Sequence, residues 1–221
     1  MSAHSSLQHY LFKNASIVAM LSLAGTVSGF ILDALILSLF GMGHLTDALA
    51  AALTVPLIIG GVIKIQVPKL LIPVFTEHRV HHGESRAWDL LSSLVTTSFF
   101  VLVGISLVGV ALSGALVPLQ IPGLKSDAIS LSVWLSRMLF WLILLQGLGS
   151  ILQSVLYARH SYLISSSGKL VANISTIAVV ILWYDILGVE AVAGGMLFGE
   201  FVEVALLAWA QIGRASCRER V

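Results

Sequence analysis

The feature that most constrains this chain is a long apolar run, Ser16–Phe40, that carries one carboxylate, Asp33, in its middle. A run of about 20 apolar residues is long enough to cross the hydrocarbon core of a bilayer as a helix. A charge at the centre of such a span costs about 2.5–3.5 kcal/mol on insertion scales. We therefore expect Asp33 to face protein or a water-filled cavity, and we expect Gly29 beside it to admit another backbone or a bulky ligand.

The composition of the whole chain supports a membrane environment. Apolar residues make up 57% of its 221 residues and charged residues only 10%, whereas an ordinary soluble domain has about 25% charged residues. The net charge of +1 gives no reason to expect a nucleic-acid partner, and the single cysteine excludes an internal disulfide. The sequence contains no P-loop, H-E-x-x-H, zinc-ligand spacing or G-x-S-x-G. We therefore expect no cofactor and no metal, and His78, His81 and His82 are interpreted as residues of a solvated loop.

Six membrane-spanning helices account for the apolar runs, so the predicted fold class is an all-α integral membrane protein. The expected spans are Ser16–Phe40, Leu45–Phe75, Trp88–Val117, Ile129–Tyr157, Tyr162–Tyr184 and Val189–Ala210. A polar loop is predicted over Glu77–Arg86. Proline removes a backbone donor and clashes with the preceding turn, so we expect the second span to kink near Pro56 and to break near Pro68.

Basic residues predict the orientation of the chain. They occur at the N-terminus and in or near every second loop, at Lys13, Arg79, Arg86, Arg159 and Lys169, whereas the alternate loops hold only Lys125. Because positively charged loops stay in the cytoplasm, the N-terminus is predicted to be cytoplasmic.

The domain organisation expected from the sequence has three parts. Residues 1–15 form a polar N-terminus, residues 16–211 form the membrane lobe, and residues 212–221 read IGRASCRERV. The last string resembles the translation of a sequencing adapter, so we expect the natural protein to be represented only to about Gln211. The alternative is a genuine basic cytoplasmic tail.

Several charged residues inside the spans are candidates for function. Asp47 is either part of a cavity wall or the N-cap of the second helix. Lys64 suits either an ion pair or an anionic substrate. Glu200 and Glu203 are three residues apart and share one helix face. Two neighbouring carboxylates repel each other, so one of them could bind a proton at neutral pH. They are interpreted as an ion-coupling site with Arg137 as a possible partner, or as a structural ion pair between helices.

Three stretches resemble the MviN/MurJ family, which are lipid-linked oligosaccharide flippases of the multidrug/oligosaccharidyl-lipid/polysaccharide exporter superfamily. They are SGFILDALILSLFGMGHLTDALAAALTVP (Ser28–Pro56), LYARHSYLISSSGKLVANISTIAVV (Leu156–Val180), and the glycine-containing sixth span. The resemblance implies two six-helix lobes around a central cationic cavity that takes lipid II, with this chain as the first lobe and the second lobe of the same chain as its partner. Where the family pattern has arginines, this sequence has Thr26, Leu32, Gly60 and Gly61.

The function predicted from these observations is that of the N-terminal half of an inner-membrane flippase. It would work by alternating access on a lipid-linked or amphipathic substrate other than lipid II. The predicted substrate-binding residues are Asp33, Asp47, Lys64, Gly29 and Pro56, and the predicted ion-coupling residues are Glu200, Glu203 and Arg137. A polysaccharide or multidrug exporter of the same superfamily, a six-span membrane enzyme and a scaffold that does not transport are the alternatives.

Overall fold

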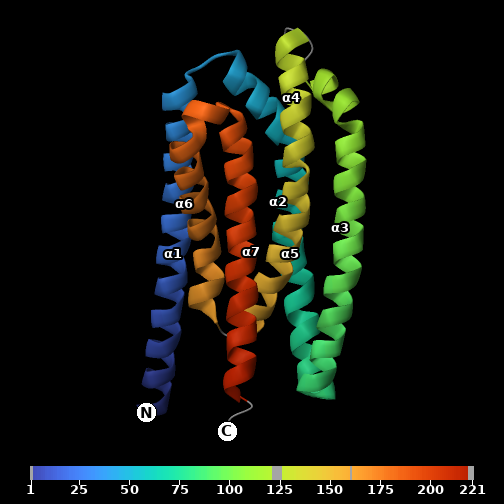
Figure 1. The fold of residues 1–221 in the computed structure, drawn as a ribbon. Coiled ribbons are helices and arrows are strands. Elements are labelled where there is room, and N and C mark those ends of the chain that lie inside the picture. The colour runs from blue at the N-terminus through green and yellow to red at the C-terminus, as the bar shows by residue number, and fades with distance from the viewer. Residues whose placement is uncertain (1, 121–125, 160, 219–221) are drawn as a thin grey trace.

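The computed structural model has seven helices among the residues that it describes. It describes the backbone of residues 2–120, 126–159 and 161–218, and it describes side chains between residues 16 and 211, except at 79, 82, 84, 85, 87, 88, 121–127 and 160. The helices are α1 (Ser2–Phe40), α2 (His44–His82), α3 (Glu84–Gln120), α4 (Ser126–Leu139), α5 (Trp141–Ala158), α6 (Tyr162–Leu187) and α7 (Glu190–Arg218). They run roughly along one axis, and the two ends of the chain lie at the same end of the bundle (Figure 1). An even number of crossings explains that placement.

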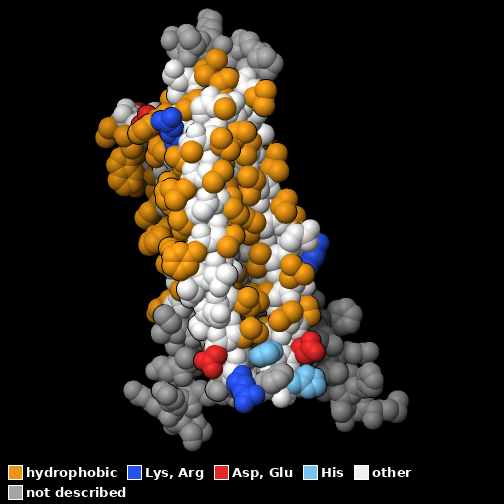
Figure 2. Space-filling view, turned by 90° about the vertical axis from the view of Figure 1, so that its right-hand side faces the viewer, with side chains coloured by type: hydrophobic (Ala, Val, Ile, Leu, Met, Phe, Trp, Pro, Cys, Tyr) orange, Lys and Arg blue, Asp and Glu red, His pale blue; other side chains and the backbone are white. Residues whose placement is uncertain are grey.

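The predicted all-α membrane fold is confirmed. Within the described residues, six segments are long and apolar enough to cross a bilayer: Ser16–Phe40, His44–His78, Asp89–Gln120, Ala128–Ala158, Tyr162–Leu187 and Glu190–Gln211. In the face shown in Figure 2, hydrophobic side chains cover the middle of the bundle, and charged and histidine side chains gather at the lower end. Large apolar side chains such as Phe30 and Trp209 are more than 70% exposed, as expected where lipid is the solvent.

Two expectations, one about the second span and one about the loop after it, are wrong. The helix α2 does not break near Pro68 but continues through Pro56, Pro68 and Pro73 to His82. Proline weakens a helix by removing one hydrogen bond, and a membrane tolerates this loss when neighbouring helices and local adjustments satisfy the freed groups. The predicted loop Glu77–Arg86 is also almost entirely helical. Only Gly83 separates α2 from α3, with a φ of +84° that favours glycine.

The fourth span is interrupted, where the sequence predicted one continuous helix. Phe140 separates α4 from α5, and its carbonyl accepts a hydrogen bond from the Ile143 N–H at 3.2 Å, which tightens the chain locally. The fully buried ring of Phe140 packs against Gly109 of α3, where a Cβ would overlap the ring. A glycine in α3 therefore makes room for an aromatic side chain at the junction of the two half-helices.

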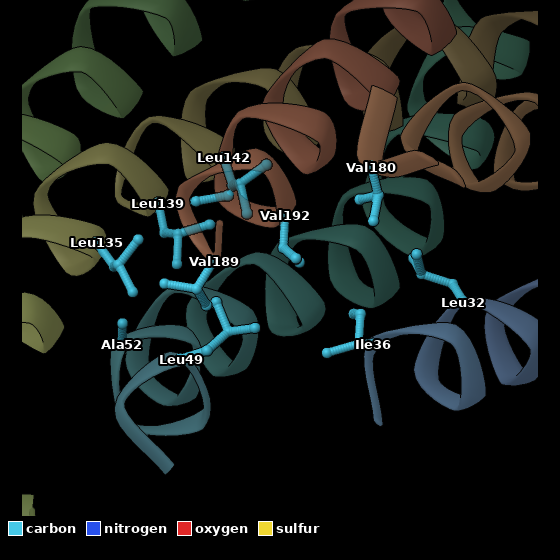
Figure 3. Close-up of a cluster of buried hydrophobic side chains, with 11 residues drawn as sticks. Leu32, Ile36, Leu49, Ala52, Leu135, Leu139, Leu142, Val180, Val189 and Val192 are labelled. Carbon is cyan, nitrogen blue, oxygen red and sulfur yellow. The ribbon is translucent and has the colours of Figure 1, made fainter. Parts of the chain in front are cut away.

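A hydrophobic cluster joins six of the seven helices. It contains Leu32 and Ile36 of α1, Leu49 and Ala52 of α2, Leu135 and Leu139 of α4, Leu142 of α5, Val180 of α6, Val189 of the turn before α7, and Val192 and Ala193 near the start of α7 (Figure 3). A second cluster packs α2, α3 and α5 together through Leu71, Phe75, Leu91, Ile151 and Val155. These contacts hold α2 against α5 and bring α6 and α7 between α1 and α5.

The helices α6 and α7 approach each other closely at Gly199. A Cβ at Gly199 would overlap the backbone carbonyl of Ala172 and the Thr176 hydroxyl. Small residues allow membrane helices to pack this closely. On the same helix, Gly194 has open space around its Cα.

We predict that Gly199→Ala destabilises the lobe by about 1–3 kcal/mol, because the added methyl group must displace backbone rather than a flexible side chain. Gly194→Ala is the matched control, and it should be neutral or should stabilise the helix by up to about 1 kcal/mol. The measurement is the melting temperature of the purified protein in detergent. Equal melting temperatures for the two variants would contradict the close contact between α6 and α7.

Candidate functional site

A cluster of charged side chains links α2 to α7 inside the membrane-spanning part of the lobe. The Lys64 Nζ atom lies 2.8 Å from Glu200 Oε1 and 3.1 Å from Glu200 Oε2, and it lies 3.8 Å from Glu203 Oε2. The side chains of Lys64, Glu200 and Glu203 are 33%, 13% and 6% exposed. Of the two alternatives for Lys64, the structure therefore shows the ion pair.

The helix α5 contributes a neutral polar group to this cluster. The Gln146 Nε2 atom donates a hydrogen bond of 3.0 Å to Glu200 Oε1. Gln146 is buried, and it reaches Glu200 because Gly60 of α2 has no side chain; a Cβ at Gly60 would overlap the amide oxygen of Gln146. Glycine at this position is thus required by the packing of the cluster.

The most buried member of the cluster is Glu203. Its Oε2 atom has less than 1 Å² of accessible surface and no hydrogen-bond partner. The helix α6 passes close to it at Gly168, where a Cβ would lie 2.6 Å from Glu203 Oε1. The approach of Gly168 excludes solvent from a carboxylate for which Lys64 is the one cation within ion-pair distance among the residues that the structure describes.

Pro68 weakens the turn of α2 that carries Lys64. Because proline has no N–H, Pro68 leaves the backbone carbonyl of Lys64 without its usual partner four residues later. The helix is continuous here, but one of the hydrogen bonds that would stiffen it at Lys64 is missing.

A pocket of about 130 Å³ lies beside the cluster, and the Glu200 and Gln146 side chains form part of its wall. Five helices contribute to it, α1, α2, α5, α6 and α7. Its lining residues are Leu32, Leu57, Leu142, Gln146, Ala172, Asn173, Thr176, Met196 and Glu200. A pocket with amide, hydroxyl and carboxylate groups inside a span is unusual, since polar groups at membrane depth are costly unless they line a cavity or pair with one another.

One wall of the pocket is fixed by a polar bridge between α6 and α1. The Asn173 Nδ2 atom donates hydrogen bonds of 2.9 Å to the Gly25 carbonyl and to the Ser28 hydroxyl. It lies 3.4 Å from the position that a Cβ at Gly29 would occupy. The neighbour of Gly29 is thus a side-chain amide of α6, whereas the sequence led us to expect another backbone or a bulky ligand there.

The two predicted aspartates lie outside this cluster. Asp33 is exposed on α1, one residue after Leu32, which lines the pocket. Asp47 is exposed in the first turn of α2. The N-cap alternative for Asp47 is wrong, because Gly43 occupies that position and Asp47 follows it by four residues. A carboxylate in the first turn of a helix is still favoured by the helix dipole.

Pro56 and Arg137 also lie apart from the charged cluster. Pro56 is in the interior of α2. Arg137 is exposed on α4, and its Nε atom donates a 3.3 Å hydrogen bond to the Ser113 hydroxyl of α3. The structure thus brings Lys64, rather than Arg137, to Glu200 and Glu203. The reason is the register of α4, in which the neighbouring residues Leu135, Ser136 and Leu139 are buried and Arg137 points away from them.

Comparison with known proteins decides the family. A family model described as the lipid II flippase MurJ matches residues 36–215, which is most of the chain. The chain belongs to the MurJ family.

Curated relatives agree with this assignment. Probable lipid II flippases MurJ from Buchnera aphidicola (subsp. Acyrthosiphon pisum) and from Synechocystis are each 28% identical, over 170 and 211 residues. The lipid II flippase MurJ of Burkholderia cenocepacia is 25% identical over 171 residues. These alignments cover 76%, 88% and 76% of this chain and 33%, 38% and 33% of the relatives. The chain thus spans between a third and two fifths of the length of these relatives.

Solved structures show the same fold. A structure of the lipid II flippase MurJ in an inward closed conformation matches with a TM-score of 0.73 and 16% identity, over 86% of this chain and 41% of that chain. A MOP superfamily transporter from Pyrococcus furiosus matches with a TM-score of 0.72 and 13% identity, over 89% of this chain and 44% of that chain. These matches show the fold; the family model, which describes flippases, gives no support to the six-span enzyme considered from the sequence.

The structure shows what surrounds the four positions at which the MurJ resemblance implies arginine. Leu32 is buried and lines the pocket, Gly60 faces Gln146, and Gly61 has open space around its Cα. Thr26 is exposed, and its hydroxyl donates to the Ser22 carbonyl. None of these positions supplies a cation to the pocket.

Several residues that complete this site in the MurJ-family lobe were not predicted from the sequence. Gln146, Thr176 and Gly168 were not predicted as site residues, and Asn173 was noticed only as part of a motif. The signal that could have identified Gln146 is its place as an isolated amide in the apolar run WLILLQGLGS, since polar groups within a span usually face a partner. Which helix supplies that partner cannot be read from one sequence.

We predict that Lys64→Met destabilises the lobe, because it leaves two carboxylates without their counter-ion. Breaking a buried pair costs about 3–5 kcal/mol, and the cost here should be smaller because a third of the Lys64 side chain is exposed. Lys69→Met on the same helix is the matched control, since Lys69 is exposed. The two variants are compared by thermal unfolding, and a Lys64→Met protein as stable as the Lys69→Met protein would contradict the role of the ion pair.

Proposed function

We propose that this chain forms the first lobe of a flippase that moves a lipid-linked or amphipathic substrate across the bacterial inner membrane by alternating access. Membership of the MurJ family supports the transport class. The observation that carries the proposal is the pocket, because it places amide, hydroxyl and carboxylate groups inside a lobe whose outer surface is apolar. Transporter sites lie near the middle of the membrane between structural repeats, and this pocket has the composition of half of such a site.

The second half of the cavity is proposed to come from the rest of the same polypeptide. The chain matches only 33% to 38% of the length of the relatives quoted above and 41% to 44% of the matched structures. A second lobe of similar size would leave the pocket at an interface between two rigid bodies. Rocking of the lobes about that interface would expose the pocket to each side of the membrane in turn.

The proposed orientation places both ends of the chain in the cytoplasm. The two ends lie at the same end of the bundle (Figure 1). The turn between α2 and α3 lies near Arg79 and Arg86, and the connection between α5 and α6 lies near Arg159 and Lys169. The positive-inside rule assigns such connections to the cytoplasm. The connections between α1 and α2 and between α6 and α7 would then face outward.

The charge of the pocket wall favours a substrate other than a pyrophosphate-linked one. Arginine is suited to pyrophosphate because its planar fork binds two phosphate oxygens, yet the four positions discussed above hold no arginine. Lys64 is already paired with Glu200 and lies near Glu203. For the Pyrococcus furiosus transporter of similar fold, reverse polarity of the binding pocket suggests a different function. We infer a comparable change of polarity in this lobe.

A polysaccharide or multidrug exporter of the same superfamily is the second candidate. The same fold occurs in the Pyrococcus furiosus protein, a MOP superfamily transporter for which a different function is suggested. Both candidates use the same rocking motion. The cations of the second lobe would distinguish them, because a pyrophosphate group needs positive partners somewhere in the cavity.

Transport is proposed to be driven by an ion gradient or by the membrane potential. Glu200 and Glu203 are the proposed ion-coupling residues, and the structure gives them Lys64 as a partner. Asp33 is proposed to line the wet side of the lobe beside the pocket, because an exposed carboxylate in mid-span is tolerated only where water or another lobe faces it.

We predict that Asp33→Asn in the full-length transporter lowers substrate flipping by about tenfold or more, corresponding to about 1.4 kcal/mol of lost interaction. The matched control is Glu77→Gln, since Glu77 is an exposed carboxylate near the end of α2, at the edge of the membrane-spanning part. The measurement is flipping of a fluorescent lipid-linked oligosaccharide in proteoliposomes. Equal rates for the two variants would contradict a place for Asp33 in the transport cavity.

A further inference from the structure

We propose that Glu203 is a proton-binding site, and that its proton determines whether Lys64 is held by Glu200 alone or is shared between Glu200 and Glu203. This inference deepens the proposed ion coupling and rests on it for its role in transport. It assigns the coupling ion, the residue that binds it and the contact between helices that responds to it.

The first observation is an imbalance of charge. Lys64 is the only cation within ion-pair distance of Glu200 and Glu203 among the described residues, so two carboxylates share one ammonium group. The helix α5 offers only the neutral Gln146 to the cluster, since Trp141–Ala158 contains no charged residue. With both carboxylates ionised, the immediate cluster would keep one negative charge in a poorly hydrated place, which is costly.

The other helices that pack against α7 do not remove this imbalance by direct contact. Lys169 of α6 is exposed and packs its stem against Gly25 of α1, although its charge does act on Glu203 at longer range. Arg137 of α4 is bonded to Ser113. Neither residue is within ion-pair distance of Glu203.

The second observation is the state of the Glu203 carboxylate itself. The residue is 4% exposed, and its Oε2 atom points toward Lys64 at 3.8 Å without a hydrogen-bond partner. Glu200, in contrast, is bonded by Lys64 at two oxygen atoms and by Gln146. A buried carboxylate without a hydrogen bond is the member of the pair that gains most from binding a proton.

A proton fits this place better than a metal ion does. A metal ion needs several oxygen ligands around it, but the Lys64 ammonium group already occupies the position between the two carboxylates. The Oε2 atom of Glu203 has less than 1 Å² of accessible surface, so an added ion would have to displace Lys64. A proton adds almost no volume and brings the one positive charge that the cluster lacks.

The proposed step is a simple protonation. One O–H bond forms between a proton and the Glu203 carboxylate, no other bond breaks, and Lys64 keeps its charge and remains with Glu200. The distances of 2.8 Å to Glu200 and 3.8 Å to Glu203 correspond to this arrangement. When the proton leaves, the ionised Glu203 attracts Lys64 and weakens its hold on Glu200.

This exchange would move α2 relative to α7. Lys64 is on α2, and Glu200 and Glu203 lie almost one turn apart on α7. Because Pro68 cannot donate a hydrogen bond to the Lys64 carbonyl, this turn of α2 is easier to deform. Glu200 also lines the pocket, so the same shift would change one wall of the pocket.

The test is pH-difference infrared spectroscopy on the full-length protein in lipid, which detects the C=O stretching band of a protonated carboxylic acid. We expect a band that disappears reversibly as the pH is raised, that is missing in Glu203→Gln and that is unchanged in Glu190→Gln. Glu190 is the matched control because it lies in the first turn of the same helix. In Lys64→Met the band should persist to higher pH, since no ammonium group remains to stabilise the ionised carboxylate. A merely structural glutamate would show none of these changes.

Thermal unfolding gives a second measurement that does not require transport. Raising the pH removes the proton from Glu203 and should lower the melting temperature of the wild type by a few degrees. The Glu203→Gln side chain resembles the protonated acid, so the melting temperature of this variant should not show that fall. The proposal is overturned if Glu203→Gln retains the titrating band, or if its melting temperature falls with pH as steeply as that of the wild type. A titrating Glu203 in a protein that flips no lipid would contradict the proposed transport and leave the proton site standing.

Discussion

The lobe depends on one constraint, which is that a charge inside a lipid-embedded protein needs a partner. Lys64, Glu200 and Glu203 lie in spans whose outer faces are apolar, and both carboxylates lie within 3.8 Å of the Lys64 Nζ atom. Their meeting requires two glycines: Gly60 lets Gln146 reach Glu200, and Gly168 lets α6 pass beside Glu203. The ion pair thus determines which helices can approach and which positions must lack a side chain.

The same residues connect packing to function. The hydrophobic cluster around Leu32, Leu142 and Val192 packs six helices together, and the Asn173 bridge fastens α1 to α6. Leu32, Leu142 and Asn173 also line the pocket, which has Glu200 and Gln146 in its wall. In this chain, the charged residue in the pocket wall is therefore Glu200, which is paired with Lys64, and no arginine is among the described residues that line the pocket.

Much of the fold could be predicted from the sequence, because hydrophobic length alone identifies spans. The six spans were found within a few residues, whereas the continuity of α2 through Pro68 and the interruption at Phe140 were not. Both depend on tertiary contacts: neighbouring helices support α2, and Gly109 of α3 accommodates the Phe140 ring. The charged candidates Lys64, Glu200 and Glu203 were recognisable as polar residues in apolar runs. Their pairing was not, because helix order in the bundle and the rotation of α4, which turns Arg137 away, are properties of packing.

The most direct test of the central claim is a double-mutant cycle between Lys64 and Glu200, measured as the free energy of unfolding of the wild type, Lys64→Met, Glu200→Gln and the double variant. Because the two side chains are in contact at 2.8 Å, the account predicts a coupling energy of about 1–3 kcal/mol, so that the second substitution costs much less once the first is made. Additive effects of the two substitutions would contradict the account, since they would show that α2 and α7 are not held together by this pair.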